Sequence, residues 1–468
     1  MERLAPEIIS SIIFYLHEEL DPFDRNPETI VPLAPLATLS RQWQPLVEAI
    51  TFRKLFLNSE SLPLAVDSDL LTPRRLSYIR HLNFDFLFPA YETVSTRDED
   101  WDDHAVFATA LQQLFELIAR IPSGQEPLIK LVLSIPVPRR YEGGDQKSDV
   151  INSRLRTIYF EISSEAQTGL PKLPMIRSFS TAAPACSVVF SPRAVCLMAS
   201  KMPRLREVEL RLSDDEKVDP LIRIQQRKGL AHSLRELPPS IHLFFLEYLR
   251  DIPIDHDFTP PTIIPQGEED CLSKALRQFS QREELKDFHF QGSIEPTIFW
   301  PLEGSSTTET LHWPSLKSFV VRPHSVLPSG KWLVIASNTA RPEGTVVNSS
   351  RIPGEDIYRQ YRDFPHYPLM NGFFLAAARC VARMPKAEYC SVMFHDAWLT
   401  SLDFCTEFPE DPCLKVTGRA DPILDKKMLA VWQELAEARD IAFRLQILED
   451  SNYNIWRLSS PDEDLDWA

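Results

Sequence analysis

The side chains that could perform chemistry are few. Ser329-Gly330-Lys331 is similar to the end of a phosphate-binding P-loop, but Trp332 stands where Ser or Thr would bind magnesium, and Ser325 stands where the first glycine is needed. The patterns G-x-G-x-x-G, G-x-S-x-G and H-E-x-x-H do not occur in the sequence. The sequence therefore contains no complete catalytic signature.

Two further groups in the last third of the chain have reactive side chains. His395-Asp396 could exchange protons, but no nucleophile accompanies it, and a polar pair at a strand end is the simpler interpretation. Cys405 and Cys413 with His395 could be drawn as a metal site, although their spacing matches no common zinc pattern. We predict no catalytic residues, no cofactor and no metal. An enzyme whose site leaves no sequence signature stays an alternative.

The composition restricts the class of partner and compartment. The 468 residues are 44% hydrophobic and 25% charged, as in ordinary globular proteins, and the net charge is −16. Because binding to nucleic acid needs a basic face, we predict no nucleic-acid partner, and the acidic sequence gives no sign of an arginine cluster. No apolar stretch reaches about 18 residues, so we predict no membrane span. Seven scattered cysteines without C-x-x-C favour reduced thiols in a cytoplasmic or nuclear protein.

The elements that must position these side chains follow a recurring order of helix, proline-containing turn and strand. Pro192 opens one such unit, which runs as a helix to Lys201, turns at Met202-Pro203 and ends in a strand with alternating apolar residues at 205–212. The same order recurs with helices at 105–120, 271–280, 371–383 and 422–439. In each unit, a segment whose apolar residues follow helical periodicity precedes a segment in which apolar and polar residues alternate. This order suggests strands aligned side by side with helices on one face of the sheet.

The strand starts are too unevenly spaced for a regular leucine-rich array, whose period is about 20–29 residues. We predict an α/β protein in which residues 57–460 form an irregular leucine-rich-repeat-like α/β solenoid with long loops, the longest at 339–367. A short acidic tail follows at 461–468. A doubly wound α/β domain is the alternative fold.

Residues 1–56 form a separate predicted domain, a helical module. Pro6 suits the first turn of a helix, and Glu7 places negative charge near the positive end of the helix dipole. The apolar residues that follow recur with helical spacing through Leu16, and a second such segment surrounds Trp43. These apolar side chains exceed what so small a unit can bury by itself. The pattern is typical of a docking module, but periodicity alone fits the first helical hairpin of a larger domain at least as well.

The module resembles an F-box. Leu4, Glu7, Ile8, Ile12 and Leu16 match the F-box opening, the segments 39–43 and 46–47 match its middle, and 52–55 match its end. Two features depart from the usual pattern: the opening proline is displaced by one position, and the insertion 17–32 is long and acidic. A downstream segment, 299–332, resembles a stretch that recurs in uncharacterised fungal proteins with an N-terminal F-box. The resemblance implies adaptor-binding residues at Leu4, Pro6, Glu7, Ile8, Ile12, Leu16, Leu39, Trp43 and Leu46.

The resemblance implies a substrate receptor of an SCF-type cullin ubiquitin ligase. In such receptors the module binds the adaptor subunit, and through it the cullin, while the second domain binds a target protein; the receptor itself catalyses nothing. The alternative is a non-catalytic scaffold in which the module only caps the solenoid. Arg206, Arg211, Lys286 and Lys317 are of the type that lines a target-binding face, but no sequence pattern singles them out.

Overall fold

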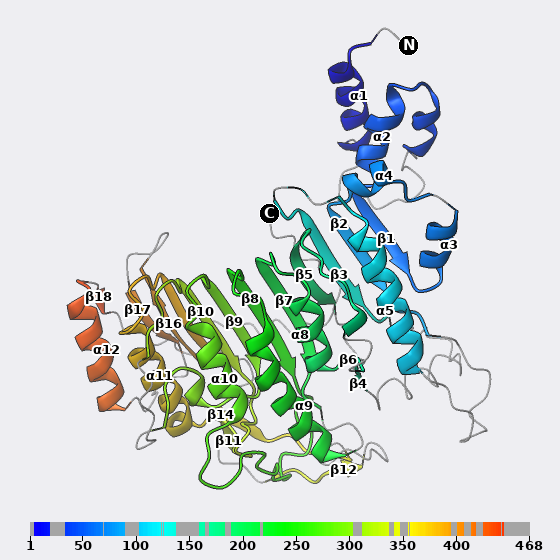
Figure 1. Ribbon diagram of the computed structural model, residues 1–468. Coiled ribbons are helices and arrows are strands. Elements are labelled where there is room, and N and C mark those ends of the chain that lie inside the picture. Colours follow the sequence, from blue (N-terminus) through cyan, green and yellow to red (C-terminus); the bar gives the residue numbers. More distant parts are fainter. Residues whose placement is uncertain are drawn as a thin grey trace.

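The chain consists of a small helical unit followed by one large mixed α/β body, as the computed structural model shows (Figure 1). The structure describes residues 4–18, 33–68, 70–88, 103–122, 124, 126–136, 159–163, 168–182, 189–215, 219–302, 311–336, 341–346, 354, 356–394, 400–406, 413–417, 425–440 and 442–443. The predicted acidic tail 461–468 and the pair His395-Asp396 lie outside these residues.

A 12-stranded sheet organises the large body, and its strands stack in the order in which they occur in the chain. Neighbouring strands pair in parallel as far as β15, then β15, β16 and β17 pair antiparallel, and β18 is parallel to β17. The order has no reversal point, which a doubly wound sheet requires. The strands are β1 (Lys54–Asn58), β2 (His81–Asp85), β3 (Ile129–Ser134), β5 (Ile176–Ala182), β7 (Glu207–Ser213), β8 (Leu243–Leu249), β9 (Asp287–Gly292), β10 (Ser318–Pro323), β15 (Tyr389–Phe394), β16 (Thr400–Cys405), β17 (Cys413–Thr417) and β18 (Ala442–Phe443).

Helices between the strands lie on the same face of the sheet (Figure 1). The helices of this body are α3 (Ser61–Asp67), α4 (Pro73–Tyr78), α5 (Asp103–Ala119), α8 (Pro192–Ser200), α9 (Pro220–Ser233), α10 (Cys271–Ser280), α11 (Tyr367–Val381) and α12 (Lys426–Ala438), with 3₁₀ turns η2 (Leu234–Glu236) and η3 (Pro296–Ile298). The expected α/β class is confirmed. The antiparallel strands β16 and β17 were not expected from the sequence.

Short polar residues and prolines set where the helices begin. The carboxylates of Asp219, Asp270 and Asp425 accept hydrogen bonds from backbone N–H groups in the first turns of α9, α10 and α12, at 2.8–2.9 Å. Pro192 and Pro220 occupy the first positions of α8 and α9, where a missing N–H costs nothing. Many of the 39 prolines thus mark the junctions of a repeated unit.

Alternation along the strands separates a buried face from an open one. In β3, Ile129, Leu131 and Leu133 are buried under the helices, whereas Lys130 and Val132 on the opposite face are only partly buried. The buried residues join into one core that continues from Leu57 to Leu435. Because every strand adds to the same core, the body folds as a single apolar layer between sheet and helices.

Three short strand pairs lie outside the large sheet. They are β4 (Tyr159–Phe160) with β6 (Val189–Phe190), β11 (Val334–Ala336) with β14 (Arg362–Pro365), and β12 (Thr345–Val346) with β13 (Ile357–Tyr358). The last two pairs fall largely in the stretch 339–367, which we expected to be wholly irregular. Backbone pairing across that stretch satisfies N–H and C=O groups that a loop would leave to water.

Candidate functional site

The helical unit has a hydrophobic core of its own. It is made of α1 (Pro6–Glu18), the 3₁₀ turn η1 (Ala34–Thr38) and α2 (Trp43–Thr51), and it projects beyond the amino-terminal ends of β1 and β2 (Figure 1). Its core contains four buried apolar residues, Ile9, Ile13, Trp43 and Val47, and it is separate from the core of the large body. Such a unit is a distinct packing element and not the first layer of the sheet.

The residues that the F-box resemblance assigned to adaptor binding fall into three groups. Pro6, Glu7 and Ile8 are exposed at the start of α1, as is Leu39 after η1, and the apolar Ile8 and Leu39 expose 50% and 45% of their surface. Leu4, Ile12 and Leu46 are partly buried and pack against the small core. Trp43 is only 4% exposed, so it lies within that core. Leu16 is in α1, but its side chain lies outside the described part of the molecule.

An ion pair network ties the unit to the large body. Glu48 in α2 is buried and accepts hydrogen bonds from Arg74 at 2.7 Å and from Arg75 at 2.8 Å, both in α4. Burial alone would raise the pKa of Glu48, but the hydrogen bonds from Arg75 and Gln44 and the two positive charges hold it below its usual value. The first sheet strand, β1, begins at Lys54, within the segment 1–56, and Leu55 packs against the large core.

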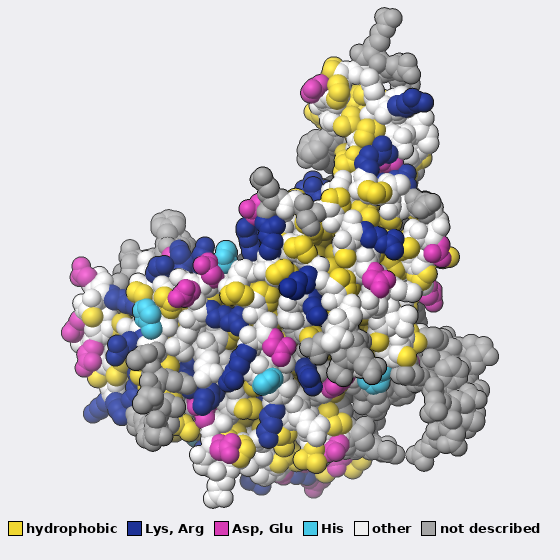
Figure 2. Space-filling view, in the orientation of Figure 1, with side chains coloured by type: hydrophobic (Ala, Val, Ile, Leu, Met, Phe, Trp, Pro, Cys, Tyr) yellow, Lys and Arg dark blue, Asp and Glu magenta, His cyan; other side chains and the backbone are white. Residues whose placement is uncertain are grey.

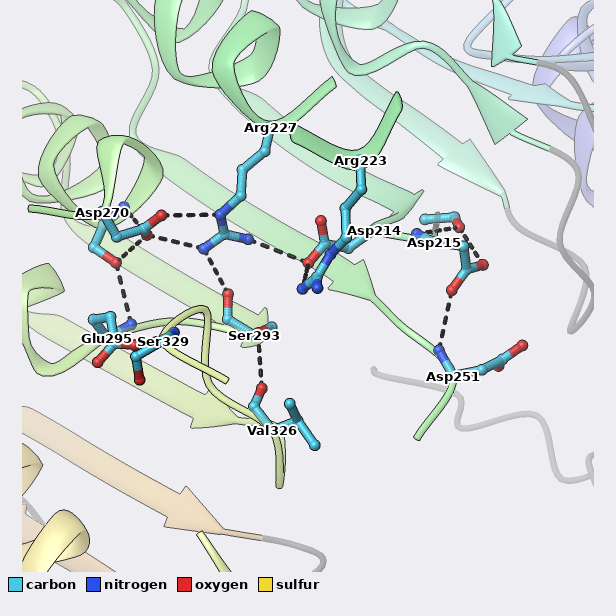
Figure 3. A network of polar contacts seen from close by, with 12 residues as sticks. Asp214, Asp215, Arg223, Arg227, Asp251, Asp270, Ser293, Glu295, Val326 and Ser329 are labelled. Carbon is cyan, nitrogen blue, oxygen red and sulfur yellow. Dashed lines mark hydrogen bonds and ion pairs between the residues drawn. The ribbon is translucent and has the colours of Figure 1, made fainter. Parts of the chain in front are cut away.

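A second polar network lies at the carboxyl-terminal ends of β7 and β9 (Figure 3). Arg227 of α9 donates to both carboxylate oxygens of Asp270 at 3.0 and 2.9 Å and to Asp214 at 3.2 Å. Arg223, one turn earlier, donates to Asp214 at 2.8 Å, and all four side chains are almost fully buried. Arg227 also donates to the backbone oxygen of Ser293 at 2.8 Å. The network thus joins β7, α9, α10 and the segment after β9.

The charges within this network are compensated. Burial alone would raise the pKa of Asp270, but Arg227 and Ser273 hold it below its usual value. Two arginines face two aspartates, so no net charge is left for an anionic or cationic ligand. The bordering cavity, next to Ile263 and Glu268, is about 30 Å³, which is room for one water. We assign the network a structural role in fixing how consecutive units pack.

The loops at the same edge are held by His256. Its Nδ1 accepts hydrogen bonds from the backbone N–H groups of Tyr361 at 2.8 Å and Arg362 at 2.7 Å. The ring also lies 5.3 Å from the ring of Trp332. Burial lowers the pKa of His256, the charge of Arg362 lowers it further, and Asp255 acts in the opposite sense.

We expect a pH dependence of stability from His256. Because its folded pKa lies below the ordinary 6.5, the unfolded chain binds the proton more readily. The contribution of neutral His256 is therefore complete above about pH 6.5 and is lost as the pH falls below that value. His256→Asn keeps an acceptor but cannot titrate, so its unfolding free energy should fall less than that of the wild type between about pH 7.5 and 5. Urea unfolding at several pH values measures this. Equal slopes of unfolding free energy against pH for the two proteins would contradict this explanation. His81 and His289 titrate in both proteins, so their contribution cancels in the comparison.

The open face of the sheet carries mixed polar and aromatic side chains. One row across the strands contains Glu209, Phe245 and His289, with the Phe245 and His289 rings 6.1 Å apart. Farther along the sheet, Asp403 accepts hydrogen bonds from Tyr389 at 3.2 Å and from Ser391 at 2.6 Å. These side chains give the face no single dominant charge.

The amino-terminal ends of the strands form a second row, which sequence reasoning missed. One basic residue stands before or at the start of most strands, and successive ones are linked by backbone hydrogen bonds, as from Arg206 N–H to Arg177 and from Lys286 N–H to His242, both at 2.8 Å. Figure 2 shows Lys and Arg side chains gathered along this upper edge, here called the amino-terminal rim. The rim residues are Arg53, Arg80, Lys130, Arg177, Arg206, His242, Lys286 and Lys317.

A sequence signal for the rim exists. For each rim residue, the residue just before it is apolar, and so is the residue two positions after it. Examples are Leu205-Arg206-Glu207-Val208 and Leu285-Lys286-Asp287-Phe288. Arg206, Lys286 and Lys317, named as candidates for a target-binding face, are rim residues, whereas Arg211 lies within β7. The acidic sequence showed no arginine cluster, because neighbours on the rim are far apart in the chain.

The side chains considered for chemistry have ordinary surroundings. Ser329-Gly330-Lys331 is a turn in which Gly330 has a φ of 77°, a conformation that favours glycine. Cys390 is fully buried, and Cys405 stands opposite Cys413 in the antiparallel pair β16–β17. Within the described residues, no group of three or more His, Cys, Asp and Glu side chains is placed to hold a metal ion.

Comparison with known proteins gives no relative. No family model matches the chain, and no curated protein matches it either. Among the helices that the structure describes, none combines the length and the apolar character needed to cross a bilayer. The function must therefore be inferred from the surfaces described above.

Proposed function

We propose that the chain is the substrate-recognition subunit of an SCF-type cullin ubiquitin ligase. The observation that carries this proposal is the helical unit, which has its own small core and yet leaves Ile8 and Leu39 exposed on its surface. Exposed large apolar side chains on a projecting unit are what an adaptor interface of standard size, about 1,600 Å² in total, would cover. The receptor supplies no catalytic group; it raises the concentration of a bound target near the ubiquitin-loaded enzyme.

We infer that the large body is an irregular leucine-rich-repeat-like solenoid that binds the target. Its strands follow chain order and are parallel from β1 to β15, so each unit contacts only its neighbours, as in repeat proteins. The open sheet face with Phe245, His289 and Tyr389 is the surface that we assign to target recognition.

Two exposed residues test the adaptor interface. Ile8→Asp together with Leu39→Asp should abolish co-purification of an SCF adaptor with the full chain, because both substitutions place charge in an apolar contact. The melting temperature should stay unchanged, since neither side chain belongs to the small core. The matched control, Ser10→Asp with Thr38→Asp, changes exposed polar residues of the same unit and should retain the adaptor. Adaptor recovery unaffected by Ile8→Asp and Leu39→Asp would exclude this interface.

The scaffold alternative is favoured by the Glu48 contacts with Arg74 and Arg75, which attach the unit firmly to the first sheet unit. If the unit is only a cap, the full chain should bind no adaptor, and Glu48→Gln should destabilise the large body. If the unit is a docking module, Glu48→Gln should leave adaptor recovery intact. Pull-down and thermal unfolding of the same variant separate the two functions.

A further inference from the structure

One part of the amino-terminal rim carries positive charge that no carboxylate neutralises. At the starts of β1, β2 and β3 lie Arg53, Lys54, Arg80, His81 and Lys130, here called the basic cluster. Within the described residues, none of the five forms an ion pair. Burial, followed by the charges of Lys54, Lys130 and Arg53, lowers the pKa of His81, so the cluster has a positive field.

The rest of the rim differs from the basic cluster. Arg177 pairs with Glu207 at 3.0 Å, and Arg206 pairs with Glu126 at 2.6 Å. Lys317 likewise contacts Glu388. Because strands are about 4.8 Å apart, the five residues of the basic cluster lie within a width of about 10 Å over β1, β2 and β3. Lys286 also forms no ion pair among the described residues, but it stands alone between His242 and Lys317, which are paired. A duplex nucleic acid needs a longer basic surface, whereas a short acidic peptide fits this width.

A depression lies within the basic cluster, at the junction of α2 and α4 with the sheet. It has a volume of about 230 Å³ and is lined by Ala49, Arg53, Tyr78 and Arg80. Arg80 is held in place, because its Nη1 donates to the backbone oxygens of Ser77 at 2.9 Å and Ile79 at 2.8 Å. The lining combines apolar stems and a tyrosine ring with two guanidinium groups. Such a lining suits a large apolar or aromatic side chain flanked by carboxylates.

We propose that this depression and the basic cluster bind the chain's own acidic segment 461–468. That segment reads Pro-Asp-Glu-Asp-Leu-Asp-Trp-Ala, with Trp467 next to Asp466 and three further carboxylates just before them. Trp467 occupies the depression, and the carboxylates face Arg53, Lys54, Arg80 and Lys130. Charge complementarity carries the assignment: the five basic residues of the basic cluster form no ion pair among the described residues, and the segment carries four acidic side chains close to Trp467.

The chain is long enough for this contact. Residues 444–460 separate β18 from the acidic segment and span at most about 55–60 Å when extended. Ten strand spacings separate β18 from β2, or about 48 Å at 4.8 Å each. Because this linker must be close to full extension, its effective concentration lies below the millimolar values of relaxed short linkers, but the tethered segment still competes with a free peptide. An external acidic partner must therefore displace it.

The test uses the full chain with Asp462, Glu463, Asp464 and Asp466 replaced by their amides. A fluorescein-labelled synthetic peptide of residues 459–468 is the probe, and anisotropy measures its binding. We expect the peptide to bind this variant at least about tenfold more tightly than the wild type, whose own segment competes. Adding Arg53→Glu and Arg80→Glu to the variant should weaken binding at least about tenfold, whereas Arg206→Glu with Lys286→Glu should change it less than about twofold.

The outcomes are distinct from those of the adaptor experiment, because the acidic segment does not enter that interface. Absence of peptide binding to the amide variant would overturn the proposal, provided that its thermal unfolding matches the wild type. Equal weakening by the Arg53→Glu, Arg80→Glu pair and the Arg206→Glu, Lys286→Glu pair would also overturn it, because the attraction would then be that of the whole rim. Binding only in a dimer seen by light scattering would assign the segment to a second copy. Loss of affinity when the peptide carries Trp467→Ala supports the role of the depression. If the Arg53→Glu and Arg80→Glu substitutions unfold the chain, the milder Arg53→Gln and Arg80→Gln substitutions replace them.

Discussion

Arg227→Met is expected to lower the free energy of unfolding by about 3–5 kcal/mol. Arg227 is almost fully buried and carries the only charge within hydrogen-bonding distance of both Asp214 and Asp270 among the described contacts of these residues. Removing it leaves buried carboxylate charge that Arg223 only partly compensates. Urea denaturation followed by circular dichroism measures the loss.

Two controls distinguish this explanation from lost packing. Arg235→Met changes an exposed arginine in η2 and should shift stability by no more than about 0.5 kcal/mol. Arg227→Met combined with Asp270→Asn and Asp214→Asn removes the stranded charges and should recover a large part of the loss. A triple variant as unstable as Arg227→Met alone would show that the arginine acts through its volume and not through its charge.

Trp43→Ala should unfold the helical unit while the large body stays folded. Truncating a buried tryptophan costs about 3–5 kcal/mol, and the unit's core contains only three other fully buried apolar residues, Ile9, Ile13 and Val47. Since the two cores are separate, the loss should remain local. Hydrogen exchange measured by mass spectrometry should show lost protection in α1 and α2 and unchanged protection in β2 and β3.

The matched variant is Leu39→Ala, which removes an apolar side chain from the surface of the same unit. It should leave exchange in α1 unchanged, because Leu39 contributes little to the small core. Loss of protection in β2 and β3 with Trp43→Ala would mean that the unit and the sheet fold as one. In that case the unit is a structural cap, and the adaptor interface loses its main support.

Local patterns predicted much of the large body. The helix that follows Pro192, the turn at Met202-Pro203 and the strand at 205–212 appear in the structure as α8 and β7 with nearly the expected ends. Helix 271–280 is reproduced by α10. These elements can be predicted from the sequence because proline placement, helix capping and apolar periodicity each depend on only a few neighbouring residues. The pair β16–β17 was missed because, unlike the strands of the repeated unit, these two strands follow no helix among the described residues.

The buried network and the basic cluster had no such signal. Arg223 and Arg227 have the spacing of ordinary surface arginines on a helix, and only the approach of α10 places Asp270 beside them. Arg53, Arg80 and Lys130 come from three consecutive units and become neighbours through strand register alone.

The sequence by itself indicated the α/β class, the repeated helix–turn–strand unit and an apolar helical segment at the amino-terminal end, although β1 begins at Lys54, inside the predicted module 1–56. It also supplied the resemblance on which the proposed ligase role rests. Only the tertiary structure decided that Trp43 lies inside the module while Ile8 and Leu39 remain outside. Only it brought Arg227 to Asp214 and Asp270 and, among the described residues, left the cations over β1–β3 without an ion pair. The physical reason is range: helix and strand patterns depend on residues a few positions apart, whereas burial and charge pairing depend on which distant segments the sheet register brings together.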